Sequence, residues 1–118
     1  MVLIGKVVKG QGFARLAFGL PTANLDLDEA VTLEAGVYVG YTTVEAGRFP
    51  SVIYIGPQAS EKVETHLFGF DADLYDQTVE IEIVKLISEY VPWKSEEQMK
   101  AKVAADVQKA RGYFSTAF

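Results

Sequence analysis

Two short stretches of the chain carry side chains whose types and spacing can do chemistry. The first is Leu20-Pro21-Thr22-Ala23-Asn24-Leu25, which holds the only asparagine among the 118 residues. Its proline fixes one backbone angle and favours an extended residue before it. In extended chain the hydroxyl of Thr22 and the amide of Asn24 point to the same side, where they can jointly hold a hard cation or a phosphate oxygen. The alternative is that both side chains close a turn after the proline.

A glycine-punctuated run precedes this segment. Gly10, Gly12 and Gly19 leave a loop without bulky side chains at these positions, so backbone N–H groups can approach an anion closely. Such a loop beside the oxygens of Thr22 and Asn24 favours a phosphate-bearing ligand over a simple turn.

The second stretch is Val63-Glu64-Thr65-His66-Leu67, which has the pattern of a strand. Alternation places Glu64 and His66 on one face of that strand. A carboxylate within about 3 Å of a substrate hydroxyl can accept its proton as the hydroxyl attacks, and Glu64 can otherwise be a solvated strand residue. His66 is the only histidine, which excludes a histidine-cluster metal site, and a lone histidine in a strand is more often a hydrogen-bonded structural residue than a catalyst.

Composition excludes several classes of function. The chain is 49% hydrophobic and 23% charged, contains no cysteine, and carries a formal net charge of −5. Its scattered Lys and Arg residues do not form the basic surface that nucleic acids require, and no apolar run approaches the roughly 20 residues that span a bilayer. The opening residues lack the order of a secretory signal, and without cysteine there are no disulfides. We therefore expect one soluble, cytoplasmic domain over residues 1–118 that binds neither nucleic acid nor membrane.

The apolar pattern predicts a chain made mainly of short strands, at residues 3–8, 37–44, 51–55, 62–68 and 78–87. Between the first two of these, Asp26 and Asp28 mark a turn, and residues 31–33 are a short extended piece. The strand at 78–87 alternates strictly at first and becomes apolar on both sides at Val84 and Leu86, which indicates a covering element there.

One helix follows this last strand and can supply the cover. Ser95 is its expected N-cap, with Gln98 at the third helical position, and Gly112 lies just past its expected end. Its apolar stripe consists of Met99, Val103, Val107 and Ala110. Several short strands and one terminal helix predict a small antiparallel barrel with a helix packed on it.

Five blocks of residues and the final helix occur along the chain in a familiar order. The blocks are Gly5-Lys6-Val7-Val8-Lys9-Gly10-Gln11-Gly12, Phe18-Gly19-Leu20-Pro21-Thr22-Ala23-Asn24-Leu25, Gly36-Val37-Tyr38, Val63-Glu64-Thr65-His66 and Asp73-Leu74-Tyr75. Over nearly its whole length the chain thus resembles the riboflavin kinase (flavokinase) family, in its stand-alone, single-domain type. The resemblance implies a mainly β fold, a six-stranded antiparallel Greek-key barrel with a C-terminal α-helix.

What the resemblance implies for function is transfer of the γ-phosphoryl group of ATP to the 5′-hydroxyl of riboflavin, giving FMN and ADP. We expect the protein to be a monomer. It assigns Glu64 as the catalytic base, and it assigns Thr22 and Asn24 to Mg²⁺ and the nucleotide phosphates. Further nucleotide contacts fall on Gly10, Gly12, Leu67 and Tyr75, and the flavin contact falls on Trp93.

Three departures from the family pattern leave alternatives open. Ser88 and Glu89 stand where the family has an arginine-proline pair, the loop at 56–60 is short, and the phosphate loop carries Phe13, Ala14 and Leu16. One alternative is a flavin- or nucleotide-binding barrel with weak or no kinase activity, and another is a barrel used only for protein interaction. Ligand titration separates them, because the last predicts neither flavin quenching nor nucleotide-dependent stabilisation.

Overall fold

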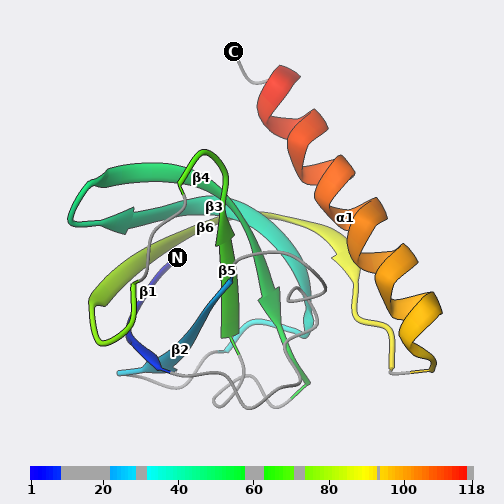
Figure 1. The fold of residues 1–118 in the computed structure, drawn as a ribbon, viewed down its shortest axis with the longest axis horizontal. Coiled ribbons are helices and arrows are strands. Elements are labelled where there is room, and N and C mark those ends of the chain that lie inside the picture. The colour runs from blue at the N-terminus through cyan, green and yellow to red at the C-terminus, as the bar shows by residue number, and fades with distance from the viewer. Residues whose placement is uncertain (9–21, 29–31, 58–62, 71–73, 93, 117–118) are drawn as a thin grey trace.

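Six strands and one helix make up the described part of the chain, which covers residues 1–8, 22–28, 32–57, 63–70, 74–92 and 94–116 of a computed structural model (Figure 1). The strands are β1 (Val2–Val8), β2 (Ala23–Leu27), β3 (Gly36–Val44), β4 (Gly47–Ile55), β5 (Val63–Leu67) and β6 (Thr78–Glu89), and the helix is α1 (Glu96–Thr116). The strands pair antiparallel in the order β1-β2-β5-β4-β3-β6 and close into a barrel.

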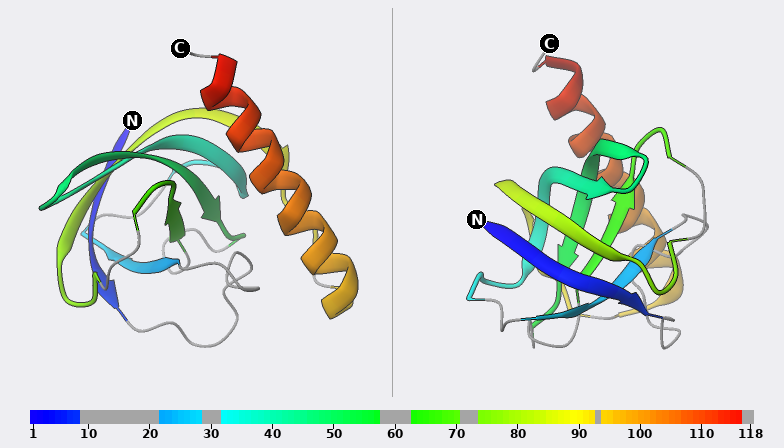
Figure 2. Two further views of the ribbon diagram at one scale, coloured as in Figure 1. Left: turned by 45° about the horizontal axis from the view of Figure 1, so that its top comes forward. Right: turned by 90° about the vertical axis from the view of Figure 1, so that its left-hand side faces the viewer.

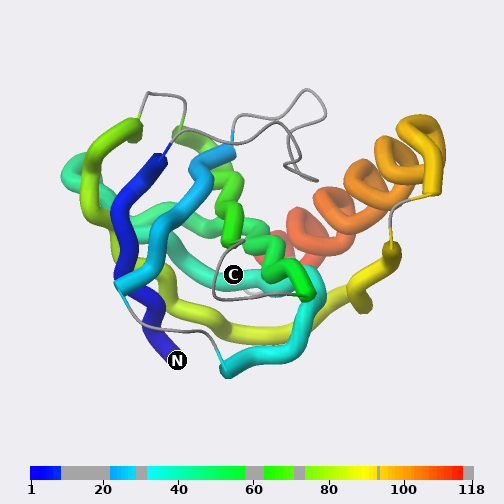
Figure 3. The backbone as a smooth tube through the Cα atoms, turned by 90° about the horizontal axis from the view of Figure 1, so that it is seen from below, coloured from blue at the N-terminus to red at the C-terminus, as the bar shows by residue number. Residues whose placement is uncertain are grey.

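The connectivity of the barrel is a Greek key. Strands β3, β4 and β5 follow one another as neighbours, and β6 then returns to lie beside β3. The predicted mainly β, six-stranded antiparallel Greek-key barrel with a C-terminal helix is thereby confirmed. Figure 3 shows that α1 lies outside the ring of strands.

Alternation along the strands divides the apolar side chains between two clusters. Inward-pointing side chains from all six strands fill the barrel, with Ile53, Ile55 and Ile81 fully buried. The second cluster lies on the outer face of β3 and β4, where α1 packs against it (Figure 2). Its buried members are Val37, Val39, Val52, Tyr54, Val103, Val107, Ala110 and Phe114. Strands β3 and β4 are therefore buried on both faces, by the barrel interior on one side and by α1 on the other.

The start of α1 has the predicted cap. The backbone N–H of Gln98 donates to Ser95 Oγ at 3.2 Å, and that of Met99 donates to the carbonyl oxygen of Ser95 at 2.9 Å. The predicted apolar stripe of Met99, Val103, Val107 and Ala110 is buried throughout.

The end of α1 differs from the prediction. The helix continues through Gly112 to Thr116, so the expected end at Gly112 is wrong. Beyond the glycine, Phe114 is buried on the outer face of the barrel, with its ring 6.0 Å from that of Phe68. This packing outweighs the ~1 kcal/mol that a glycine costs inside a helix.

No helix in the described part of the chain has the length and hydropathy needed to cross a membrane.

Two residues of β6, Val84 and Ile87, are skipped in its ladder with β3. Each is thus an extra residue in the strand, a β-bulge that breaks the inward-outward alternation. Ile87 packs in the outer cluster under α1, whereas Val84 is 44% exposed. The cover expected over the second half of β6 is therefore present at Ile87 and does not extend to Val84.

Strand β2 forms where a turn was expected. Leu25 and Leu27 alternate toward the barrel interior, which carries Asp26 into an outward ladder position opposite Lys6. The short extended piece expected at 31–33 is not a strand at Thr32 and Leu33, the two of its residues that the structure describes.

Removing the helix cap has a predictable cost. We expect Ser95→Ala to lower the free energy of unfolding by about 1 kcal/mol, because the N–H of Gln98 loses its acceptor. Chemical denaturation followed by circular dichroism measures the loss. Ser95→Asp keeps an acceptor, and its free energy of unfolding is expected to lie within a few tenths of a kcal/mol of that of the wild type. Equal destabilisation by both substitutions would contradict the capping role.

Candidate active site

The two stretches singled out in the sequence are neighbours in the barrel. Strand β2 pairs with β5, and in that ladder Asn24 lies directly opposite Glu64. Side chains directly opposite each other in an antiparallel pair have Cβ atoms about 4.5–5.5 Å apart. Because Val63 and Leu67 point into the barrel, Glu64 points outward, on the same face as Asn24. An amide oxygen and a carboxylate thus share one spot on the outside of the barrel.

Glu64 is buried even though it points outward, with only 5% of its surface exposed. Its ladder partner on β4 is Tyr54, a buried member of the outer apolar cluster. The ring of Tyr54 lies 6.4 Å from that of Tyr90, just beyond β6. Glu64 therefore has an amide on its β2 side and an aromatic pair on its β4 side. In such a low-dielectric setting a carboxylate interacts strongly with a bound hydroxyl or cation.

His66 shares this outer face with Glu64, as alternation predicts, and is buried too. Its ring meets the ring of Phe68 edge-on at 5.2 Å, and Phe68 in turn contacts Phe114 of α1. These contacts support the structural interpretation of His66, as part of the aromatic packing under the helix.

The oxygen donors around Glu64 suit a hard cation. Thr22 is half-buried immediately before β2, two positions from Asn24. A hydroxyl, an amide oxygen and a neighbouring carboxylate are the ligand types that Mg²⁺ takes. The described residues hold no group of three or more His, Cys, Asp or Glu that could bind a metal. The donors fit Mg²⁺, in the manner of a site that also relies on water and substrate phosphates.

The other residues predicted to contact the nucleotide lie at different places. Leu67 points into the barrel interior, on the opposite face of β5 from Glu64, so only its backbone faces the site. Tyr75 is 50% exposed in the turn before β6. The neighbouring N–H of Asp76 donates to the carbonyl of Val7 at 2.9 Å, which ties this turn to the end of β1 beside Asn24. Gly10, Gly12 and Trp93 lie outside the described residues.

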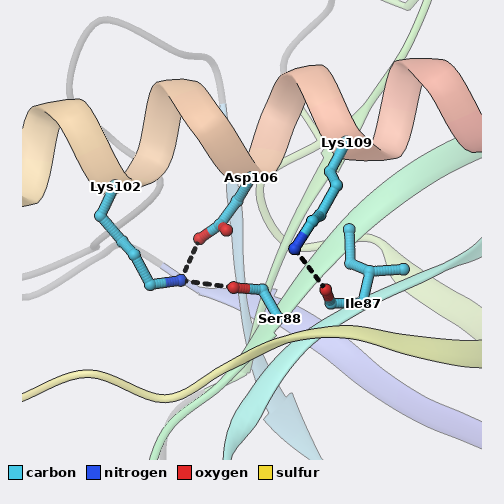
Figure 4. A network of polar contacts seen from close by, with 5 residues as sticks. All are labelled: Ile87, Ser88, Lys102, Asp106 and Lys109. Carbon is cyan, nitrogen blue, oxygen red and sulfur yellow. Dashed lines mark hydrogen bonds and ion pairs between the residues drawn. The ribbon is translucent and has the colours of Figure 1, made fainter.

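The end of β6 holds a contact that the sequence reasoning missed. Lys102 of α1 donates from Nζ to Ser88 Oγ at 2.7 Å and pairs with Asp106 Oδ2 at 2.5 Å (Figure 4). Ser88 stands where the resemblance expected an arginine, so the helix brings a different cation to this position. The only signal in the sequence was the spacing of Lys102 and Asp106, four residues apart on one helix face.

Comparison with known proteins decides the family. The Flavokinase model, described as riboflavin kinase, matches residues 1–114. The chain belongs to the riboflavin kinase family. Among curated relatives it is 29% identical over 120 residues to the bifunctional riboflavin kinase/FMN adenylyltransferase of Haemophilus influenzae, covering 97% of this chain and 39% of the relative. The Escherichia coli protein of the same name is 31% identical over 116 residues, covering 93% of this chain and 37% of the relative. The chain thus spans about two fifths of the length of these relatives.

Solved structures show the same fold. A riboflavin kinase from Trypanosoma brucei matches with a TM-score of 0.70 and 26% identity, covering 97% of this chain and 76% of that one. A Streptococcus pneumoniae structure titled macrolide-efflux protein matches with a TM-score of 0.79 and 26% identity, covering 93% of this chain and 38% of that one. The stand-alone, single-domain type expected for this riboflavin kinase family member remains a prediction.

Proposed function

We propose that this chain is an ATP:riboflavin 5′-phosphotransferase, a kinase that converts riboflavin and ATP into FMN and ADP. The observation that carries the proposal is the pairing of Asn24 with Glu64 across β2 and β5, which places an amide side chain beside a buried carboxylate. Membership of the riboflavin kinase family is the reason for proposing riboflavin and ATP as the substrates.

In the proposed reaction Glu64 accepts the proton of the riboflavin 5′-hydroxyl as its oxygen attacks the γ-phosphorus of ATP. The new bond is the ester P–O bond of FMN, and the bond that breaks joins the γ-phosphorus to the bridging oxygen, which leaves with ADP. Bound Mg²⁺ would neutralise charge on the phosphates. Thr22 and Asn24 orient the phosphate end through their side-chain oxygens, while Tyr54 and the outer cluster keep water from the carboxylate.

Other residues complete the proposed site. We assign the backbone of Gly10 and Gly12 to the nucleotide phosphates, Leu67 and Tyr75 to the nucleotide, and Trp93 to the flavin ring, all from the family resemblance. The protein would act as a soluble, cytoplasmic monomer whose kinase domain spans residues 1–118.

A second candidate is a flavin- or nucleotide-binding barrel with weak or no kinase activity. It is favoured by Ser88, which contacts Lys102 where the family pattern has an arginine. Incubation of the protein with riboflavin, ATP and Mg²⁺, followed by chromatography of the flavins, separates the two functions. A kinase converts riboflavin to FMN over many turnovers. A binder leaves riboflavin unchanged while still quenching its fluorescence.

The metal is expected to bind together with the nucleotide. Thr22 and Asn24 are neutral donors, so Mg²⁺ alone should bind weakly, and a non-hydrolysable ATP analogue should raise its affinity. Asn24→Ala is expected to weaken Mg²⁺ binding in the presence of the analogue about tenfold, a loss of ~1.4 kcal/mol. Asn24→Asp adds a negative charge and should tighten it.

Titration calorimetry with and without the analogue measures this coupling. Tight Mg²⁺ binding to the nucleotide-free protein would contradict it, and so would equal affinities in the Ala and Asp variants.

A further inference from the structure

Helix α1 holds the end of β6 through two lysines that project from the same side of the helix (Figure 4). Lys102 donates from Nζ to Ser88 Oγ at 2.7 Å, and Lys109 donates from Nζ to the carbonyl oxygen of Ile87 at 3.2 Å. Both contacts fall on consecutive residues of one strand. We call Lys102, Lys109, Ile87 and Ser88 the clamp.

The bulge in β6 and the end of its ladder with β1 explain why this point of the strand is available. Ile87 is one of the two residues that the ladder between β3 and β6 skips, while Ser88 pairs with Val37. A bulge disrupts the ladder locally and re-aims the backbone of the bulged residue. The ladder between β1 and β6 ends at Glu82, so this part of β6 pairs with β3 alone, and the carbonyl of Ile87 can take a side-chain donor from outside the sheet.

Lys102 is held rigidly enough to serve as a fixed donor. Only 23% of its side chain is exposed, and its ammonium also pairs with Asp106, which is buried. A buried charge pair contributes little net stability against an apolar replacement, but it fixes geometry, because each charge would be costly without the other. Asp106 thus holds the Lys102 ammonium over Ser88.

The clamped end of β6 leads directly toward the catalytic carboxylate. Tyr90 comes two residues after Ser88, and its ring lies 6.4 Å from the ring of Tyr54. Tyr54 is the ladder partner of Glu64. Tyr90 is half-buried and packs against the outer cluster. An aromatic ligand ring that reaches Glu64 through a flexible hydroxylated chain would find an aromatic wall here.

We propose that Lys102 and Lys109 are positioning residues for riboflavin: by clamping α1 to Ile87 and Ser88, they set where Tyr90 and Tyr54 stand beside Glu64 and so orient the flavin ring. This inference rests on the proposed function. It predicts that loosening the clamp weakens flavin binding and leaves nucleotide binding unchanged, since the nucleotide side of Glu64 is built on β2.

The sharpest test removes the clamp without leaving a charge unpaired. Ser88→Ala together with Lys109→Met removes both contacts and keeps the pair of Lys102 and Asp106 intact. We expect the Kd for riboflavin, measured by fluorescence quenching, to rise about tenfold, with the KM for ATP within about twofold of wild type. Ser88→Thr with Lys109→Arg keeps the hydroxyl and a donor, and should restore flavin affinity.

Lys100→Met is the matched control, because Lys100 is on the same helix but pairs with Glu96 at the surface, and it should leave both constants unchanged. Wild-type flavin affinity in the double variant would overturn the inference, as would equal losses for flavin and ATP. If the double variant fails to fold, Ser88→Ala alone should raise the flavin Kd about threefold, and no change would equally overturn it. A wild-type protein that quenches riboflavin but makes no FMN overturns the proposed function instead, and leaves the clamp measurable by binding alone.

Discussion

Replacing Glu64 by glutamine is expected to lower kcat by about 100-fold or more, with the fold unchanged. Glutamine has nearly the shape of glutamate but cannot accept the proton of the attacking hydroxyl. Glu64 is 5% exposed, and its ladder partners Asn24 and Tyr54 carry no carboxylate that could take its place. Riboflavin and ATP should still bind, so the loss should appear in kcat rather than in KM.

Glu80→Gln provides the matched control for this substitution. Glu80 is an exposed glutamate on β6, and its replacement removes one negative charge without touching the site. Steady-state formation of FMN should be unchanged in this variant. Turnover in Glu64→Gln within a few-fold of that in Glu80→Gln would reject Glu64 as the base.

The largest loss of stability is expected from Gly40→Ala. A Cβ at this position would lie 2.0 Å from the backbone carbonyl oxygen of Glu82 and 3.0 Å from Cδ1 of Ile53. Neither neighbour can move away without a large cost in free energy, because the backbone of Glu82 is held in β6 and Ile53 is fully buried in the barrel. We expect a loss of about 3 kcal/mol or more in the free energy of unfolding, and a Tm lower by about 10 °C.

Gly112→Ala tests the same chemical change where there is room for it. Gly112 lies within α1, and an added Cβ there meets nothing within 4 Å. Alanine is the better helix former by about 1 kcal/mol, so this variant should be more stable than wild type. Thermal unfolding followed by circular dichroism compares the two. A Gly40→Ala variant as stable as Gly112→Ala would mean that β3 and β6 do not approach as closely as the structure has them.

Local patterns in the sequence were sufficient to predict most of the elements. The alternation of apolar and polar residues predicted most strands. The N-cap at Ser95 and the apolar stripe from Met99 to Ala110 predicted the helix. The misses have non-local causes. In and just after β2, Asp26 and Asp28 alternate with leucines, a pattern that predicts a turn, and only the pairing with β1 and β5 makes this segment a strand. Helix α1 continues past Gly112 because Phe114 packs against Phe68 of the barrel.

The candidate site could be predicted residue by residue but not as a constellation. Residue types and the family resemblance pointed to Asn24 and Glu64 separately, and only the register of β2 against β5 makes them neighbours. The contact of Lys102 with Ser88 depends on the bulge at Ile87 and on the exact placement of α1; the sequence predicts that a helix covers β6, but it predicts neither the bulge nor which side chains meet. For this reason we expect Ser88→Arg to place a guanidinium against the ammonium of Lys102 and so to disturb the contact between α1 and β6.

Transfer of label from γ-labelled ATP to riboflavin tests the central claim most directly. The protein is incubated with riboflavin, γ-labelled ATP and Mg²⁺, and the label is followed into flavin, nucleotide and inorganic phosphate. A riboflavin kinase should place the label in FMN, with one ADP formed for each FMN, and Glu64→Gln should abolish nearly all of it. Label that stays in ATP, or passes only to inorganic phosphate while riboflavin remains unmodified, would contradict the assignment of this chain as a kinase.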